Sequence, residues 1–338
     1  MKKTILFLAA AALTGSFSSA RADLIDYYTL DNAALTLGGG RTDTSGSALG
    51  GGDLVTQNGA GTAAALSGKI GGSLAFPGTL NFVTGGITLP EQAEPFSLSI
   101  WLNSTVTANA TFKALGYEDK AFTDHDNSLA ITGATHVGSQ VGRNTANGSP
   151  VLASSTTTVA DGQWHLLTGV FNSQTDRRFF LDGKLVATSS TQVILWPADA
   201  TTLIQVGGFL RSSGLVDAFN GSLDDAGFFN NALTPADAAL INGLGQTAGL
   251  GLSLLAPAQS LNSAALGATS NIGGFTWQKV TGLQGATGSF GGSASGGDAF
   301  IVTDGATGSG IMTVVPEPTT AALLACGFAF AGLRRRRA

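Results

Sequence analysis

The Asp182-Gly183 dipeptide between two apolar runs is the feature that most constrains the fold of this chain. The flanking segments, residues 178–181 and 184–187, are rich in Phe, Leu and Val, which favours strands. Asp-Gly tolerates the positive φ angles of a type I′ turn, which connects adjacent antiparallel strands. The sequence therefore predicts a β-hairpin over residues 178–187.

Alternating apolar residues predict several further strands. Residues 96–102 alternate so that Phe96 and Ile100 share one face while Trp101 points to the other. Residues 163–171 are apolar on both faces, as in the centre of a sheet. Residues 203–208 and 219–229 are also expected to be strands. The 48 glycines of the 338-residue chain suit many tight turns between short strands.

One helix is predicted late in the chain. Thr234 can cap it, Pro235 fits its first turn, and Asp237 lies where a carboxylate meets free backbone amides. We expect this helix to end before Gly243. Many strands with one short late helix predict an all-β, two-sheet antiparallel sandwich.

Residues 250–314 form a Gly/Ser-rich segment in which Lys279 is the only basic residue. Residues 275–280 and 299–303 have strand composition. Because large apolar residues are few, the segment fits either a small β-appendage or a partly ordered stalk. We expect the ordered β-appendage.

The N-terminus has the pattern of a secretory signal peptide. Met1-Lys-Lys is positively charged, residues 5–13 are apolar, and small residues at Ser19-Ala-Arg-Ala22 suit signal peptidase. We expect residues 1–22 to be removed by cleavage after Ala22. The remaining chain would then work outside the inner membrane.

The C-terminus combines three elements within residues 315–338. They are a Pro-Glu-Pro start, a 13-residue apolar stretch over 321–333, and four arginines. The apolar stretch is shorter than the roughly 20 residues that cross a bilayer, and the arginines favour a cytoplasmic end. The residues of the start and the stop are Pro316, Glu317, Pro318, Arg334, Arg335, Arg336 and Arg337.

This tail resembles a PEP-CTERM sorting signal. The resemblance implies processing by an exosortase-type sorting protease, with a short membrane helix as a transient or retained inner-membrane anchor. The destination would be the cell envelope, the cell surface or the exterior. The only cysteine, Cys326, lies in this tail, so the body is expected to have no disulfide.

Removal of both ends leaves an acidic body. The whole chain has 17 basic and 22 acidic residues; the leader takes three basic residues, and the tail takes four basic residues and one acidic residue. The remaining 10 basic and 21 acidic residues give a net charge of −11. Such a surface repels nucleic acid and attracts divalent cations, which excludes a nucleic-acid-binding function.

A series of motifs runs through residues 23–249 in a recognisable order. The early motifs are Tyr28-Thr-Leu-Asp31, Asp43-Thr-Ser-Gly46 and residues 68–76; the later ones are residues 96–101, 161–165, 180–184 and 221–225, followed by 232–235. This series resembles the laminin-G-like domains of the concanavalin A-like lectin/glucanase superfamily, which implies a two-sheet jelly roll with one concave face.

No catalytic set of residues is visible. Glycoside hydrolysis needs two facing carboxylates, yet the glutamates of the body, Glu91, Glu94 and Glu118, lack the same-face alternation of bacterial β-glucanases. A hydrolase or lyase that uses aspartates stays open as an alternative. His165 follows Trp164 in a predicted central strand, where a hydrogen-bonded structural histidine is the favoured interpretation.

The superfamily resemblance also implies one structural Ca²⁺. Its ligands would be Asp224, in the final Gly-x-hydrophobic-Asp strand, and Asp43 in the early loop, with backbone carbonyls completing the shell. Strand alternation places Asp224 and Asp225 on opposite sides, so at most one joins a given site. The alternative is that both are ordinary turn acids. Residues 124–127 are expected to be a polar turn.

Sugar binding normally uses an exposed aromatic ring with a few polar groups. Trp101 and Trp164 fall inside fold motifs and are expected in the core, whereas Trp196 lies in a loop and is the candidate carbohydrate platform. The sequence thus predicts an exported, non-enzymatic envelope or matrix protein that binds carbohydrate or exopolysaccharide. A structural protein that mediates protein–protein adhesion is the alternative.

Overall fold

The structure is a computed structural model that describes most of the body of the chain. The described residues are 24–31, 54–60, 62–84, 95–119, 127–143, 149–193, 202–211, 214–281, 298–303 and 309–313. The predicted leader with Ala22, the sorting tail from residue 315, Asp43 and Trp196 lie outside them.

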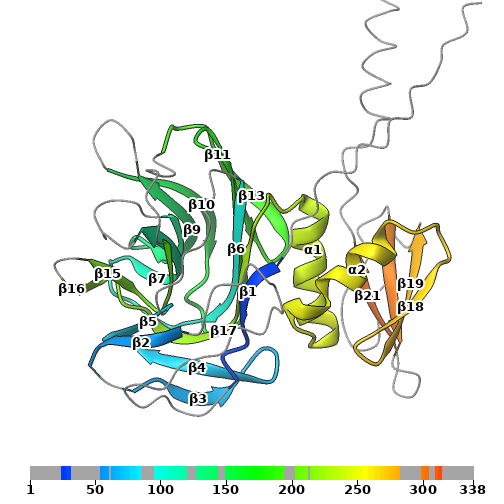
Figure 1. Ribbon diagram of the computed structural model, residues 1–338, viewed down its shortest axis with the longest axis horizontal. Helices are drawn as coiled ribbons and strands as arrows, with labels where there is room; N and C mark the ends of the chain where they lie inside the picture. Colours follow the sequence, from blue (N-terminus) through cyan, green and yellow to red (C-terminus); the bar gives the residue numbers. More distant parts are fainter. Residues whose placement is uncertain are drawn as a thin grey trace, which may run out of the picture.

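Two antiparallel sheets pack face to face, which confirms the predicted sandwich (Figure 1). The first, in the order β13-β12-β11-β6-β17-β4-β3 with β1 beside β17, consists of β1 (Leu24–Tyr28), β3 (Ala64–Ser67), β4 (Gly72–Pro77), β6 (Phe96–Asn103), β11 (His165–Ser173), β12 (Asp176–Leu181), β13 (Lys184–Ser189) and β17 (Asn220–Phe229). The second, in the order β10-β9-β8-β7-β14-β5-β2, consists of β2 (Leu54–Gly59), β5 (Leu80–Thr84), β7 (Phe112–Asp119), β8 (Asn127–Thr132), β9 (Val137–Arg143), β10 (Pro150–Thr158) and β14 (Thr202–Val206). A separate pair is formed by β15 (Phe209–Arg211) and β16 (Gly214–Val216).

Aromatic side chains fill the space between the two sheets. Phe96 stacks on Phe171 with ring centroids 4.5 Å apart, and Tyr117 of the second sheet lies 4.6 Å from Phe228. These rings belong to one continuous core, which also buries the remaining alternate residues of β6. The alternation predicted for residues 96–102 is confirmed, with Trp101 on the opposite face.

The outer face of the first sheet is also buried. Trp101 of β6, Val170 of β11 and Phe229 of β17 join a second apolar cluster that extends into the helices and the C-terminal sheet. The Ser97 hydroxyl on this face donates to the Asn231 carbonyl and accepts from the Leu233 amide, both at 2.9 Å. These bonds fasten the segment before the first helix to β6.

Helix α1 (Pro235–Gly243) covers this outer face (Figure 1). The predicted cap is confirmed: the Thr234 hydroxyl accepts from the Asp237 amide at 3.1 Å, and the Asp237 carboxylate accepts from the Thr234 amide at 2.9 Å. The predicted end before Gly243 is wrong. The chain continues as a π turn, Leu244–Ala248, and stops at Gly249 in the left-handed region.

A second helix, α2 (Leu255–Asn262), follows a 3₁₀ turn (Leu252–Leu254) and was not predicted from the sequence. Buried residues recur at every third position through the turn and the helix, at Leu252, Leu255, Ala258 and Leu261. Lys279 donates to the Asn262 and Ala264 carbonyls at the end of this helix, where a cation meets free carbonyls. No helix in the described part of the chain is long and apolar enough to cross a membrane.

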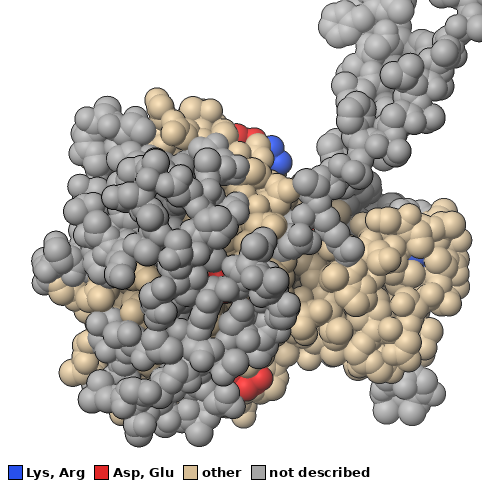
Figure 2. Space-filling model, viewed as in Figure 1, with Lys and Arg blue, Asp and Glu red and all other residues tan. Residues whose placement is uncertain are grey.

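The expected strands of the C-terminal segment are present in a four-stranded sheet. Its strands are β18 (Thr269–Ile272), β19 (Phe275–Thr281), β20 (Asp298–Thr303) and β21 (Ser309–Thr313). Trp277 and Phe300 pack edge to face at 5.7 Å and join the cluster around α1 and α2. In Figure 1 both helices therefore lie between the sandwich and the small sheet. Charged side chains are sparse among the described residues on the face shown in Figure 2.

The predicted hairpin is confirmed and contacts α1. Asp182 and Gly183 have φ angles of +49° and +74°, and a Cβ atom on Gly183 would lie 2.9 Å from the Asn242 Cβ and 3.1 Å from the Ala238 carbonyl. Gly133 has a similar φ of +72°, but a Cβ there would meet nothing within 4 Å. Both glycines adopt a positive φ, but only Gly183 is packed closely against helix α1.

We expect Gly183→Ala to lower the free energy of unfolding by at least ~1 kcal/mol more than Gly133→Ala, because only the former adds a clash with α1 to the backbone strain. Denaturant titration of both variants measures the difference. Equal losses of unfolding free energy in the two variants would show that α1 does not pack closely enough against Gly183 to exclude a Cβ atom.

Candidate functional site

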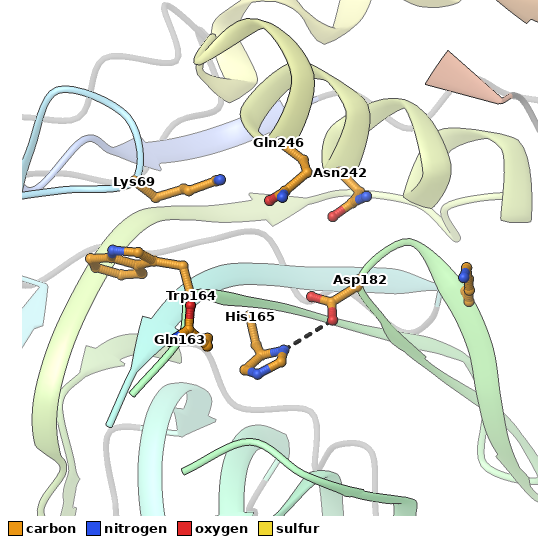
Figure 3. Close-up of a pocket in the computed structure, with 8 residues that line it drawn as sticks. Lys69, Gln163, Trp164, His165, Asp182, Asn242 and Gln246 are labelled. Atoms are coloured by element: carbon orange, nitrogen blue, oxygen red, sulfur yellow. Dashed lines mark hydrogen bonds and ion pairs between the residues drawn. The ribbon is translucent and has the colours of Figure 1, made fainter. Parts of the chain in front are cut away.

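A polar pocket of about 470 Å³ lies between the start of β11, the β12–β13 turn and the end of α1 (Figure 3). We call it the β11–α1 pocket. In Figure 3, Asn242 and Gln246 extend from the helical segment toward the side of the pocket where Trp164 and His165 lie. The lining residues are Lys69, Gln163, Trp164, His165, Asp182, Lys184, Asn242 and Gln246.

A tight turn positions the residues that begin β11. Asp161 accepts from the Gln163 amide at 2.9 Å, and Gly162 adopts a φ of +79°. The Gly162 carbonyl accepts from the Asn103 side chain and its amide donates to the Ser104 carbonyl, each at 2.9 Å. Because the turn is fastened to the end of β6, Trp164 and His165 are held at the pocket.

His165 lies between two carboxylates. Its Nδ1 is 2.9 Å from Asp182 Oδ2 and its Nε2 is 3.2 Å from Asp161 Oδ1. A neutral imidazole has only one N–H, so only the imidazolium can donate to both. The hydrogen bond with Asp182 raises the pKa of His165, burial opposes it, and the charges of Asp182 and Asp161 raise it further. The predicted hydrogen-bonded histidine is confirmed.

Asp182 has both carboxylate oxygens engaged. Oδ2 contacts His165, and Oδ1 accepts from the Leu166 amide at 2.9 Å. The Asp182 amide in turn donates to the Leu166 carbonyl at 2.9 Å. Asp182 thus joins the hairpin turn to β11, and its negative charge lies beside the His165 ring.

The π turn after α1 brings the helical segment onto Trp101. A Cβ atom on Gly245 would lie 2.7 Å from the Trp101 ring, so a larger residue would push the turn away. Gln246, the next residue, is exposed at the pocket, and Asn242 lines it one turn earlier. A π turn inside a helix is often found at a functional site.

Lys69 reaches the pocket from the loop between β3 and β4. Its ammonium lies 5.3 Å from the centre of the Trp101 ring, a cation–π contact. Burial lowers the pKa of Lys69, while the charge of Asp182 acts in the opposite direction. Among the described residues, no carboxylate lies within ion-pair distance of this ammonium.

Trp164 differs from the prediction. It was expected in the core with Trp101, but Trp101 is 1% exposed whereas Trp164 is only half-buried and lines the pocket. Trp164 precedes the first residue of β11 and packs only partly buried against the second apolar cluster. The sequence motif at residues 161–165 was recognised, but Lys69, Asn242 and Gln246 were missed since they come from distant segments.

Asp224 lies in a separate acidic cluster. It accepts from the Ile70 amide at 2.9 Å, and its other oxygen has no hydrogen-bond partner among the residues that the structure describes. Burial raises the pKa of Asp224 to about 7, and the charge of Asp31 adds to this rise. Burial raises the pKa of Asp225 well above its usual value, with a contribution from Asp224, and Asp225 accepts a hydrogen bond from the Tyr27 hydroxyl.

The alternation argument for Asp224 and Asp225 does not apply. The pairing of β17 with β6 shifts between Asp224 and Gly227, and Asp225 has a φ of +45°, so a bulge breaks the regular strand here. Among the described residues, no group of three or more His, Cys, Asp or Glu side chains is arranged to hold a metal ion. The unpartnered, buried oxygen of Asp224 nevertheless suits a hard cation.

Comparison with known families supports the sandwich. Residues 77–239 match the model of the concanavalin A-like lectin/glucanases superfamily, which supports a domain of this kind over those residues. This confirms the expected resemblance for its central part; the early motifs before residue 77 lie outside the match. No curated protein matches the chain.

Several solved structures are similar at low identity. Domain 4 of a GH43 extracellular arabinanase from Geobacillus stearothermophilus, in complex with arabinotriose, is 19% identical with a TM-score of 0.49, over 64% of this chain and 97% of that one. The CBM40 of the Ruminococcus gnavus IT-sialidase is 17% identical with a TM-score of 0.38, over 49% and 94%. A Trypanosoma rangeli sialidase is 14% identical with a TM-score of 0.42, over 63% and 31%. Similarity at this level says nothing about the ligand of this chain.

We expect His165→Asn to destabilise the protein more at pH 5.5 than at pH 8.5. The pKa of His165 is raised in the folded state, so its stabilising contribution is complete below its unfolded pKa of about 6.5 and is lost as pH rises through the folded value. Urea titrations of wild type and variant at both pH values measure this. His136→Asn controls for the substitution itself, because the His136 ring contacts a backbone carbonyl. An equal loss at both pH values would contradict a charged His165.

Proposed function

We propose that this chain is an exported carbohydrate-binding protein and that the β11–α1 pocket holds the sugar. The observation that carries the proposal is a half-buried tryptophan surrounded by polar side chains with free hydrogen-bonding capacity. Within the described residues, the side-chain amides of Gln163, Asn242 and Gln246 make no hydrogen bond with the protein. Polar groups that converge on a pocket without protein partners suit a ligand rich in hydroxyl groups.

The dimensions and chemistry of the pocket support a sugar. Its volume of about 470 Å³ lies within the usual range for small-molecule sites. The face of an aromatic ring such as Trp164 packs on the apolar side of a pyranose, while amide groups bind its hydroxyls. The superfamily that matches residues 77–239 is described by its lectins and glucanases, which agrees with a glycan ligand.

The carboxyl groups near the pocket favour binding over hydrolysis. A glycosidase needs a general acid with a raised pKa beside the sugar. Hydrogen bonding to the Gln163 amide holds the pKa of Asp161 below its usual value, and both oxygens of Asp182 are engaged. The carboxyls with raised pKa, Asp224 and Asp225, are buried and not exposed to substrate. We therefore propose a non-enzymatic role.

The route of export is part of the proposal and rests on sequence patterns alone. We propose that the leader directs the chain through the inner membrane and that the tail is processed there by an exosortase-type protease. The body would then act in the envelope, at the surface or in the extracellular matrix. An exopolysaccharide of that matrix is the proposed partner.

We expect Trp164→Ala to weaken polysaccharide binding at least about 10-fold, because an aromatic ring at the centre of a site contributes much of the binding energy. Affinity electrophoresis or calorimetry against a panel of extracellular polysaccharides measures the loss. Leu152→Ala is a matched control, since Leu152 is a 45% exposed apolar side chain on β10 and does not line the pocket. Failure of wild type to bind any polymer would refute the proposal, and release of reducing ends would restore the hydrolase alternative.

Protein–protein adhesion is a second candidate, favoured by β13. This strand ends the first sheet, and its Leu185 and Val186 are 50% and 42% exposed. An edge strand with exposed apolar side chains can pair with another chain. Cell binding that survives polysaccharide removal and Trp164→Ala, but is lost in Val186→Lys, would support this candidate.

A structural Ca²⁺ near Asp224 also remains a proposal, with Asp43 as its second ligand. In its absence the raised pKa of Asp224 predicts that stability falls as pH increases from about 4 to 7, because the folded state binds the proton more tightly than the unfolded state. Bound Ca²⁺ would instead favour the carboxylate.

We expect EDTA to lower the melting temperature at pH 8 more than at pH 5, and excess Ca²⁺ to restore it by several degrees. Asp224→Asn should remove both the metal response and the pH response. Asp176→Asn, which removes a carboxylate paired with Arg178 at the surface, should leave both unchanged. Identical melting at pH 8 with EDTA and with Ca²⁺ would discard the calcium site.

A further inference from the structure

The β11–α1 pocket concentrates positive charge on an acidic protein. Residues 23–315 contain only ten basic side chains, and two of them, Lys69 and Lys184, line this one pocket. A neutral sugar would need only the aromatic ring and the amide groups, so the lysines call for a separate explanation.

Both carboxylates near the pocket already contact a histidine ring. Asp182 and Asp161 both contact His165, which is a cation when it donates to each of them. With His165 protonated, the three cations Lys69, Lys184 and His165 face these two carboxylates, which leaves a net charge of one positive unit at the pocket.

Within the described residues, neither Lys69 nor Lys184 forms an ion pair with a carboxylate, and the ammonium of Lys69 lies over the ring of Trp101. Lys69 is half-buried, and burying an unpaired ammonium is unfavourable. A ligand carboxylate beside Lys69 would offset that loss of hydration and form a charge-assisted hydrogen bond.

We infer that the pocket is specific for a glycan that carries carboxylate groups, such as a polyuronate, and that Lys69 and Lys184 bind the carboxylate. This inference rests on the proposed function and adds the chemical class of the sugar. Trp164 would pack against the ring, and Asn242 and Gln246 would bind its hydroxyls. The net charge of −11 over residues 23–315 repels a polyanion elsewhere on the surface, which would confine binding to this pocket.

The test compares acidic polymers with neutral forms of the same backbone. The purified protein is titrated calorimetrically with polygalacturonate, alginate and hyaluronate, and with each polymer after reduction of its carboxyl groups to alcohols. We expect at least one acidic polymer to bind about 10-fold more tightly than its reduced form, with the preference falling as salt rises.

Substitutions then assign the preference to the lysines. Lys69→Met retains an apolar stem over Trp101 and removes the charge, and Lys184→Met does the same at the hairpin. We expect each to lower affinity for the acidic polymer about 10-fold while affinity for the reduced polymer is unchanged. Lys69→Arg should preserve the preference. Arg178→Met, which removes one positive charge from β12 outside the pocket, controls for net charge.

The outcomes separate this inference from the proposed function. Equal binding of acidic and reduced polymers, or a preference that survives both lysine variants, overturns the carboxylate specificity and leaves sugar binding intact. Absence of binding to these and to all neutral polysaccharides overturns both. Loss of thermal stability in Lys69→Met without a change in the acidic-to-neutral ratio would make Lys69 a purely structural cover for Trp101.

Discussion

The burial of both faces of the first sheet is the constraint on which the rest of the structure depends. Strands β6, β11 and β17 place Phe96, Phe171 and Phe228 between the sheets, but they also carry Trp101 and Val170 on the opposite face. A sheet with two apolar faces is stable in water only when both are covered. Helix α1, helix α2 and the C-terminal sheet provide this second cover, so the segment after residue 234 is part of the architecture.

The pocket lies at the end of α1, where the helices stop covering the outer face of the first sheet. Gly245 lets the π turn approach the Trp101 ring closely, and the same approach sets Asn242 and Gln246 opposite the start of β11. Trp164, just before that strand, is left half-buried, whereas Trp101 is enclosed. Packing of the π turn on Trp101 thus places polar side chains around the pocket. The same residues that cover the sheet also supply the groups that can meet a ligand.

Much of the local structure could be predicted, because local rules decide it. The φ requirement of Asp182-Gly183, the capping box of Thr234 and Asp237, and the period-two pattern of β6 each involve a few neighbouring residues. Helix α2 was not predicted, because the Gly/Ser-rich composition of residues 250–314 favoured strands or a stalk despite the recurrence of Leu255, Ala258 and Leu261. The bulge at Asp225 was missed because strand alternation presumes a regular strand.

The sequence by itself determined the antiparallel sandwich, the hairpin, the capped helix and the acidic character of the body, since these follow from periodicity, turn chemistry and charge count. Only the tertiary structure decided which tryptophan faces solvent and which distant groups meet. Lys69, His165, Asp182 and Gln246 come from four separate segments, and no spacing along the chain relates them. Their proximity is set by the packing of α1 and the β3–β4 loop around Trp101, a long-range contact that no local pattern encodes.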